Sequence, residues 1–204
     1  MGLLVGATYV AWRLRQHHAD ERRPYLRALG GGYAVGAILA IVVLGTMNMF
    51  TGPQIVRTGE RVPDFTLVNL NGDAVKFSQL AGRAVILNFW ATWCPPCRRE
   101  MPLLDAFQKE NADRGVSVVG IDVGEDPERV RRFVESMGVE YSIWVDAPKG
   151  SMEYDRSQSI HSRFGGVGLP TTIFIDPAGI ARGRHLGELN RAILQEQTED
   201  LLAQ

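Results

Sequence analysis

Cysteine is scarce in this sequence of 204 residues, which has two, Cys94 and Cys97. A zinc site needs about four ligands, and the candidates to complete one are His161 and His185, so we expect no metal centre. An excess of charge of one sign is also missing, because 22 basic and 23 acidic side chains leave a formal net charge of −1. The composition is that of an ordinary folded chain and argues against a nucleic-acid-binding protein.

Charged residues are absent from one long stretch near the N-terminus. None occurs between Arg27 and Arg57, and residues 33–50 are almost wholly apolar. Together with residues 28–32, this stretch reaches the roughly 20 residues that a helix needs to cross a bilayer. Five arginines and two acidic residues precede it, and the positive-inside rule places that side in the cytoplasm. The sequence therefore predicts a cytoplasmic segment (1–27), a transmembrane anchor (28–51), a linker (52–59) and one extracytoplasmic domain (60–204).

Other interpretations of the N-terminal region stay open. The charge-free stretch is also compatible with a buried helix of a soluble domain. A cleaved signal peptide is a stronger rival, although residues 45–49 lack the small-residue pattern of a cleavage site. A second apolar segment at 3–12 is too short to span a membrane, and is either interfacial or the remnant of a longer N-terminus.

After the linker, predicted strands and helices alternate without an internal repeat. A β-hairpin is predicted at 65–77, because Asn71-Gly72 lies between two alternating segments. The other predicted strands are 84–90, 116–122, 141–145, 171–176 and 180–186, and the predicted helices begin at Pro95 or span 126–137 and 188–203. This order predicts an α/β fold with a mixed central sheet, flanking helices and an N-terminal β-hairpin extension.

The two cysteines lie where the strand 84–90 is followed by the helix from Pro95. A Cys-x-x-Cys pair in the first turn of a helix brings the sulfurs close enough for a reversible disulfide. The helix N-terminus stabilises a thiolate on Cys94, which we expect to be the nucleophile. Cys97 lies one turn further in and is expected to be more buried, as the resolving thiol. A purely structural disulfide closing so small a loop would constrain little of the unfolded chain.

Three motifs are more specific than the cysteine pair alone. They are Pro63-Asp64-Phe65-Thr66-Leu67, the segment from Leu87 to Pro102 around Trp93-Cys94-Pro95-Pro96-Cys97, and Gly168-Leu169-Pro170-Thr171-Thr172-Ile173-Phe174-Ile175-Asp176. On these motifs, the sequence from about Gly59 to the C-terminus resembles the thioredoxin fold, and more closely the TlpA/ResA-like membrane-anchored thiol–disulfide oxidoreductases. The resemblance implies a thioredoxin-like fold and a redox-active disulfide between the two cysteines, with no cofactor.

The resemblance also implies an acidic group near the thiols. Glu100 shares a helix face with Cys97 and would exchange protons during thiol exchange. The alternative is an exposed acid paired with Arg98 or Arg99. Asn88 occupies the position where thioredoxins carry a buried aspartate, which leaves Glu100 as the nearest acid candidate in the sequence.

The substrate surface is implied by the same resemblance. Pro170 would be the cis-proline that presents a backbone edge beside the cysteines. The substrate-binding residues would be Trp93, Pro95, Pro96, Leu169 and Pro170. Trp90 is expected to pack in the core, although a packing role for both tryptophans stays open. Residues 150–162 look longer than the family's usual connection and are either an ordinary surface insertion or an element of partner recognition.

The implied function is the reduction of protein disulfides outside the cytoplasm. In this family the substrate is commonly apocytochrome c during cytochrome c maturation, and electrons come from a polytopic membrane thiol carrier. Two other classes stay open. A peroxiredoxin-like thiol peroxidase shares the Pro63-Asp64-Phe65 opening, but the proline that such enzymes have four residues before Thr92 is missing here. The other class is a non-catalytic binding module that uses the same fold.

Overall fold

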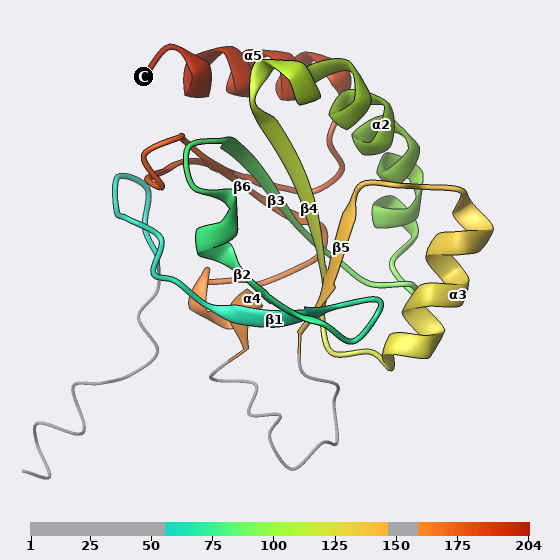
Figure 1. Cartoon of the computed structure of the whole chain (residues 1–204). Coiled ribbons are helices and arrows are strands. Elements are labelled where there is room, and N and C mark those ends of the chain that lie inside the picture. Colours follow the sequence, from blue (N-terminus) through green and yellow to red (C-terminus); the bar gives the residue numbers. More distant parts are fainter. Residues whose placement is uncertain (1–55, 147–158) are drawn as a thin grey trace, which may run out of the picture. The chain divides into compact units, whose positions relative to one another are not determined.

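The structure is a computed structural model that describes residues 56–146 and 159–204 (Figure 1). The predicted anchor at 28–51 and the apolar segment at 3–12 lie outside the described residues, as does most of the 150–162 segment. Within the two described ranges, no helix is both long enough and apolar enough to cross a membrane.

The described residues contain a seven-stranded mixed sheet with the order β2-β1-β5-β4-β3-β6-β7. Its strands are β1 (Thr66–Asn69), β2 (Ala74–Lys76), β3 (Ala84–Trp90), β4 (Val116–Asp122), β5 (Ser142–Val145), β6 (Thr171–Ile175) and β7 (Ala181–Leu186). The three strands β3, β4 and β5 run parallel, whereas β1, β2, β6 and β7 pair antiparallel with their neighbours. The predicted mixed sheet and its N-terminal β1–β2 hairpin are therefore confirmed.

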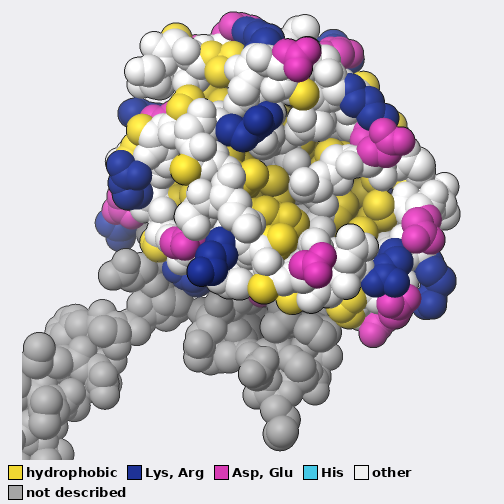
Figure 2. Space-filling view, in the orientation of Figure 1, with side chains coloured by type: hydrophobic (Ala, Val, Ile, Leu, Met, Phe, Trp, Pro, Cys, Tyr) yellow, Lys and Arg dark blue, Asp and Glu magenta, His cyan; other side chains and the backbone are white. Residues whose placement is uncertain are grey.

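Helices cover both faces of the sheet. The α-helices are α2 (Pro95–Asn111), α3 (Pro127–Met137), α4 (Ile160–Arg163) and α5 (Arg191–Leu202), and the 3-10 turns are η1 (Phe77–Leu80) and η2 (Ala112–Arg114). Side chains of α2, α3 and α5 pack in one hydrophobic core, and those of η1 and α4 pack in a second core on the opposite face. Lys and Arg side chains are interspersed with Asp and Glu over the face in Figure 2.

Capping residues set the helix boundaries. The side chain of Asp126 accepts a hydrogen bond from the backbone N–H of Arg129 and begins α3, and Gly138, with φ of 64°, ends it. The last helix begins at Arg191, three residues later than the predicted 188, because Asn190 is its N-cap. The residues just before this cap therefore form a loop, in which Glu188 and Leu189 contact α2.

The central strand β3 is buried on both faces. Successive side chains of a strand point to opposite faces of the sheet, so a residue's place in β3 decides which of the two cores it enters. Ile86 and Trp90 pack on the side of α2, whereas Leu87 and Phe89 pack on the opposite side. Asn88 has the same parity as Ile86 and Trp90. The single polar side chain of this strand therefore faces α2, the helix that carries the cysteines.

Candidate active site

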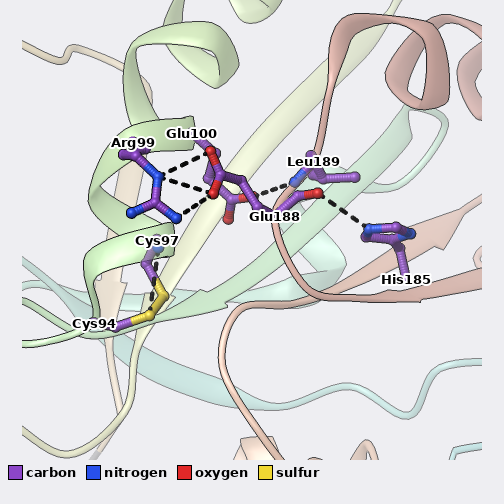
Figure 3. Close-up of polar contacts among 7 residues, drawn as sticks. All are labelled: Cys94, Cys97, Arg99, Glu100, His185, Glu188 and Leu189. Atoms are coloured by element: carbon purple, nitrogen blue, oxygen red, sulfur yellow. Dashed lines mark hydrogen bonds and ion pairs between the residues drawn. A yellow bond between two sulfur atoms is a disulfide. The ribbon is translucent and has the colours of Figure 1, made fainter.

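The turn between β3 and α2 presents the two cysteines. Cys94 is the N-cap of α2, and its Sγ accepts a hydrogen bond from the backbone N–H of Cys97 at 3.4 Å. Pro95 occupies the first helical position, where its missing N–H costs nothing. The two sulfurs are joined in a disulfide, and the Cα atoms lie 5.3 Å apart (Figure 3). Cys97 is fully buried and Cys94 is 3% exposed, which agrees with the predicted order of burial.

The peptide bond between Leu169 and Pro170 is cis, as the resemblance implied. Pro170 directly precedes β6, whose first residue Thr171 is paired with Phe89 of β3. Because the cysteine turn follows β3 at this end, the sheet register brings Pro170 to the same edge as Cys94. The backbone carbonyl of Pro170 accepts a hydrogen bond from the N–H of Gly187 at 2.9 Å, which ties it to the loop after β7.

Glu100 is buried one turn beyond Cys97 on α2, with 1% of its surface exposed. One carboxylate oxygen, Oε1, accepts from Asn88 Nδ2 at 2.8 Å, and the other, Oε2, accepts from the backbone N–H of Leu189 at 2.7 Å. Burial raises the pKa of Glu100 from 4.5 to about 7, although the two hydrogen bonds oppose this rise. Near neutral pH this carboxyl is therefore able both to give and to take a proton.

The alternative interpretation of Glu100 as an exposed acid paired with Arg98 or Arg99 is wrong. The Arg99 guanidinium instead pairs with Glu188 at 2.6 Å, on the loop between β7 and α5 (Figure 3). The Arg98 guanidinium lies 5.3 Å from the ring centre of Phe133. Helical spacing placed Glu100 near both arginines, but its side chain is buried between the sheet and the loop after β7.

Asn88 connects the sheet to this carboxyl. Its Nδ2 donates to Glu100 and also to Thr172 Oγ1 at 3.0 Å, the residue opposite it in the β3–β6 register. Its Oδ1 has no hydrogen-bond partner within the described part of the chain. A half-turn of the amide would let this oxygen accept a hydrogen bond from protonated Glu100. Asn88 is therefore suited to both protonation states, whereas an aspartate here would place a second acid against Glu100.

Sequence reasoning missed three contributors to the surroundings of Glu100. Leu189 and Glu188 come from the loop before α5, and Thr172 comes from β6. The Pro170-Thr171-Thr172 motif was a signal for Thr172. No local pattern singled out the loop residues, because they lie 89 residues from their partners on α2.

The exposed surface beside the cysteines is partly apolar. Trp93 is 57% exposed, whereas Trp90 is fully buried in the core, as predicted. Pro95 is exposed and Pro96 and Leu169 are half-buried. Pro95 also lines a shallow groove together with Arg98, Arg99 and Met137. Within residues 56–146 and 159–204, no three His, Cys, Asp or Glu side chains are grouped to hold a metal ion.

Replacing Trp93 by alanine is expected to weaken the reduction of protein disulfides without destabilising the fold. Because the side chain is largely exposed, the free energy of unfolding should change by less than about 0.5 kcal/mol. The KM for a protein disulfide should rise about tenfold, since an exposed aromatic anchor is lost, while the rate with a small aromatic disulfide should change little. Steady-state kinetics with both substrates and urea unfolding measure these effects. Equal losses with both substrates would contradict a role in substrate binding.

The disulfide at the start of α2, the cis-proline beside it and the mixed sheet define a thioredoxin-fold thiol–disulfide oxidoreductase. The chain belongs to the AhpC/TSA family, whose pattern matches residues 58–184. It is 32% identical to the thiol-disulfide oxidoreductase ResA of Halalkalibacterium halodurans, over 88% of this chain and 96% of that protein. It is 35% identical to ResA of Bacillus subtilis, over 78% of this chain and 82% of that protein.

One solved structure with the same fold carries a name that describes thiol–disulfide exchange. It is a thioredoxin family thiol:disulfide interchange protein from Chlorobium tepidum. It is 32% identical, its alignment covers 72% of this chain and 98% of that one, and the TM-score is 0.59. The predicted relation to ResA-like oxidoreductases is therefore confirmed, and the enzyme class is thiol–disulfide oxidoreductase.

Proposed function

We propose that this protein reduces protein disulfides outside the cytoplasm, and that its substrate is oxidised apocytochrome c during cytochrome c maturation. The observation that carries the proposal is a disulfide at a helix N-terminus with a buried carboxyl, Glu100, whose pKa lies near neutrality. The likeness to relatives named ResA over most of the chain supports the same function. The predicted anchor at 28–51 and the arginines before it support the location.

The proposed reaction consumes the dithiol form and regenerates the disulfide. The Cys94 thiolate attacks one sulfur of the substrate disulfide, which breaks that bond, forms a mixed disulfide and releases a substrate thiolate that takes up a proton. Cys97 then loses its proton to the Glu100 carboxylate and attacks the Cys94 sulfur, which breaks the mixed disulfide and forms the Cys94–Cys97 disulfide. The second substrate sulfur leaves as a thiolate and takes up the proton from Glu100. Two electrons have passed to the substrate, and a polytopic membrane thiol carrier would restore the dithiol by the same exchange in reverse.

Trapping in membranes tests the substrate and the partners. A full-length Cys97→Ala protein is unable to resolve the mixed disulfide, so it should accumulate covalent complexes with apocytochrome c in cells that make c-type cytochromes. A Cys94→Ala/Cys97→Ala protein is the matched control and should trap nothing. Covalent complexes formed only with other proteins would contradict apocytochrome c as the substrate.

The reduction potential tests the direction of electron flow. A reductant should have a value near the roughly −270 mV of thioredoxin, whereas a value near −120 mV is that of a strong oxidant. Equilibration of the full-length protein with glutathione or dithiothreitol buffers measures it. Labelling of single introduced cysteines in whole cells by an impermeant maleimide tests the location: a cysteine after residue 59 should react and one before residue 27 should not.

A further inference from the structure

A second buried acid lies at the end of β4, on the other side of the cysteine turn from Glu100. Asp122 is fully buried, and its Oδ1 accepts from the backbone N–H of Glu125 at 2.9 Å. Within the described residues, its Oδ2 has no hydrogen-bond partner. Asp122 is paired with Trp90 in the β3–β4 register, so this acid sits directly beside the point where β3 ends and the turn begins. The exchange reaction described above makes no use of it.

Glu125 holds the cysteine turn with both carboxylate oxygens. Its Oε2 accepts from the backbone N–H of Thr92 at 2.6 Å, and its Oε1 accepts from the Thr92 hydroxyl at 2.8 Å. The Glu125 side chain is 8% exposed and also pairs with Arg129 at 3.3 Å. Thr92 lies two residues before Cys94, whose own N–H donates to the carbonyl of Ala91. A carboxylate 33 residues away in sequence therefore fixes the backbone that leads to the nucleophile.

We propose that Glu125 is a positioning residue for the Thr92–Cys94 turn, and that Asp122 and Glu125 hold a single proton between them at neutral pH, carried by Asp122. This role belongs to the exchange chemistry itself and is independent of which disulfide is the substrate. Glu125 would thereby influence the reactivity of Cys94 independently of Glu100.

The hydrogen bonds decide which acid is ionised. Glu125 faces two donors from Thr92 and the guanidinium of Arg129, all of which favour the carboxylate. Within residues 56–146 and 159–204, Asp122 faces one donor and its buried Oδ2 faces none, which disfavours its charged form. Burial first, and then the contact with the Glu125 side chain, raises the pKa of Asp122 well above its ordinary value. A proton on Asp122 turns the contact between two acids into a hydrogen bond.

The other charged groups around the pair are on β5 and α3. Asp146, just after β5, is a third buried acid that raises the pKa of Asp122 further, and its Oδ2 accepts from the N–H of Ile160. Arg129 on α3 offsets one negative charge. Ionisation of Asp122 at alkaline pH would therefore place a second charge against Glu125 without a new cation, and this repulsion weakens the hold on Thr92.

Infrared spectroscopy of the oxidised full-length protein in detergent tests the shared proton. In a Glu100→Gln background, which removes the other perturbed acid of the site, a protonated carboxyl band should be present at pH 7 and should vanish at alkaline pH. Adding Asp122→Asn should remove this band. A Glu100→Gln protein without a protonated carboxyl band at pH 7 would overturn the proposal.

Alkylation of Cys94 tests the positioning. In the reduced protein, the rate of iodoacetamide reaction should fall about fivefold at pH 7 in Thr92→Val, which removes the hydroxyl bond to Glu125 but keeps the shape. At alkaline pH the reduced wild type should react about threefold more slowly than Asp122→Asn, because only the wild type gains the second charge. Circular dichroism confirms that each variant is folded. Superimposable pH profiles for wild type and Asp122→Asn, or an unchanged rate in Thr92→Val, would contradict the inference.

Discussion

Replacement of Cys94 by serine is expected to abolish the reduction of protein disulfides, with a loss of at least about a thousandfold in turnover. The thiolate is the attacking group, and a serine hydroxyl at the same N-cap position is neither ionised nor able to form a mixed disulfide. The measurement is the reduction of insulin disulfides with dithiothreitol as the electron donor.

The matched variant is Cys97→Ser. It keeps the attacking sulfur and removes the resolving one, so the reduced variant, mixed with insulin after dithiothreitol has been removed, should form the mixed disulfide in a single stoichiometric burst and then stop. Each variant replaces one cysteine by serine. Together they therefore distinguish the loss of attack on the substrate disulfide from the loss of resolution of the mixed disulfide. Turnover of Cys94→Ser above about one per cent of the wild-type rate would contradict the assignment of the nucleophile.

Replacement of Glu100 by glutamine is expected to remove an ionisation near pH 7 from the pH profile of disulfide exchange. Burial raises the pKa of Glu100 to about 7, so its carboxylate accepts a proton above that pH and its acid form donates one below it. Glutamine does neither, and loss of a general acid or base costs about a hundredfold in rate. Stopped-flow measurement of exchange between pH 5 and 9 gives both the inflection and the rate.

Glu100→Gln is also expected to change how the free energy of unfolding depends on pH. Folding raises the pKa of Glu100 from about 4.5 to about 7. Such an acid contributes its full stabilisation below the pKa of the unfolded state, and this stabilisation is lost as the pH rises through the pKa of the folded state. Glutamine does not ionise, so Glu100→Gln should lose less stability than the wild type between pH 5 and 8, by about 3 kcal/mol. Urea unfolding of the oxidised proteins at both pH values measures the difference, and Asp122 contributes equally to both proteins.

Glu188→Gln is the control for both measurements on Glu100. It removes a carboxylate from the same neighbourhood, but one that is partly exposed and paired with Arg99. The charge of Glu188 contributes to the raised pKa of Glu100, so this variant should move the inflection to slightly lower pH without removing it. A pH profile of Glu100→Gln that overlays the wild type would exclude Glu100 from proton transfer.

Much of the fold was predictable because its signals are local. The Asn71-Gly72 turn, the uninterrupted apolar strand 84–90 and the Asp126 and Gly138 caps each depend on residues within a few positions of one another. The helix before the C-terminus was predicted to start at 188 because its apolar pattern extends that far. The Asn190 cap starts it at Arg191 and frees the preceding residues to cover Glu100.

The sequence by itself determined the chemistry of the turn, since Cys94 and Cys97 are three residues apart at a helix start and their spacing alone allows the disulfide. It also placed Glu100 on the same helix, but left open whether that acid is buried or exposed.

Only the tertiary structure decided the burial, the hydrogen bonds and the pKa of the acidic side chains near the cysteines. The pKa of Glu100 is raised because the fold buries its carboxyl, although the hydrogen bonds from Asn88 of β3 and from Leu189 of a distant loop lower it. Glu125 holds Thr92 because β4 pairs with β3 in one particular register. Desolvation and carboxylate hydrogen bonds depend on which elements meet in space. The spacing of residues along one helix or strand does not contain that information.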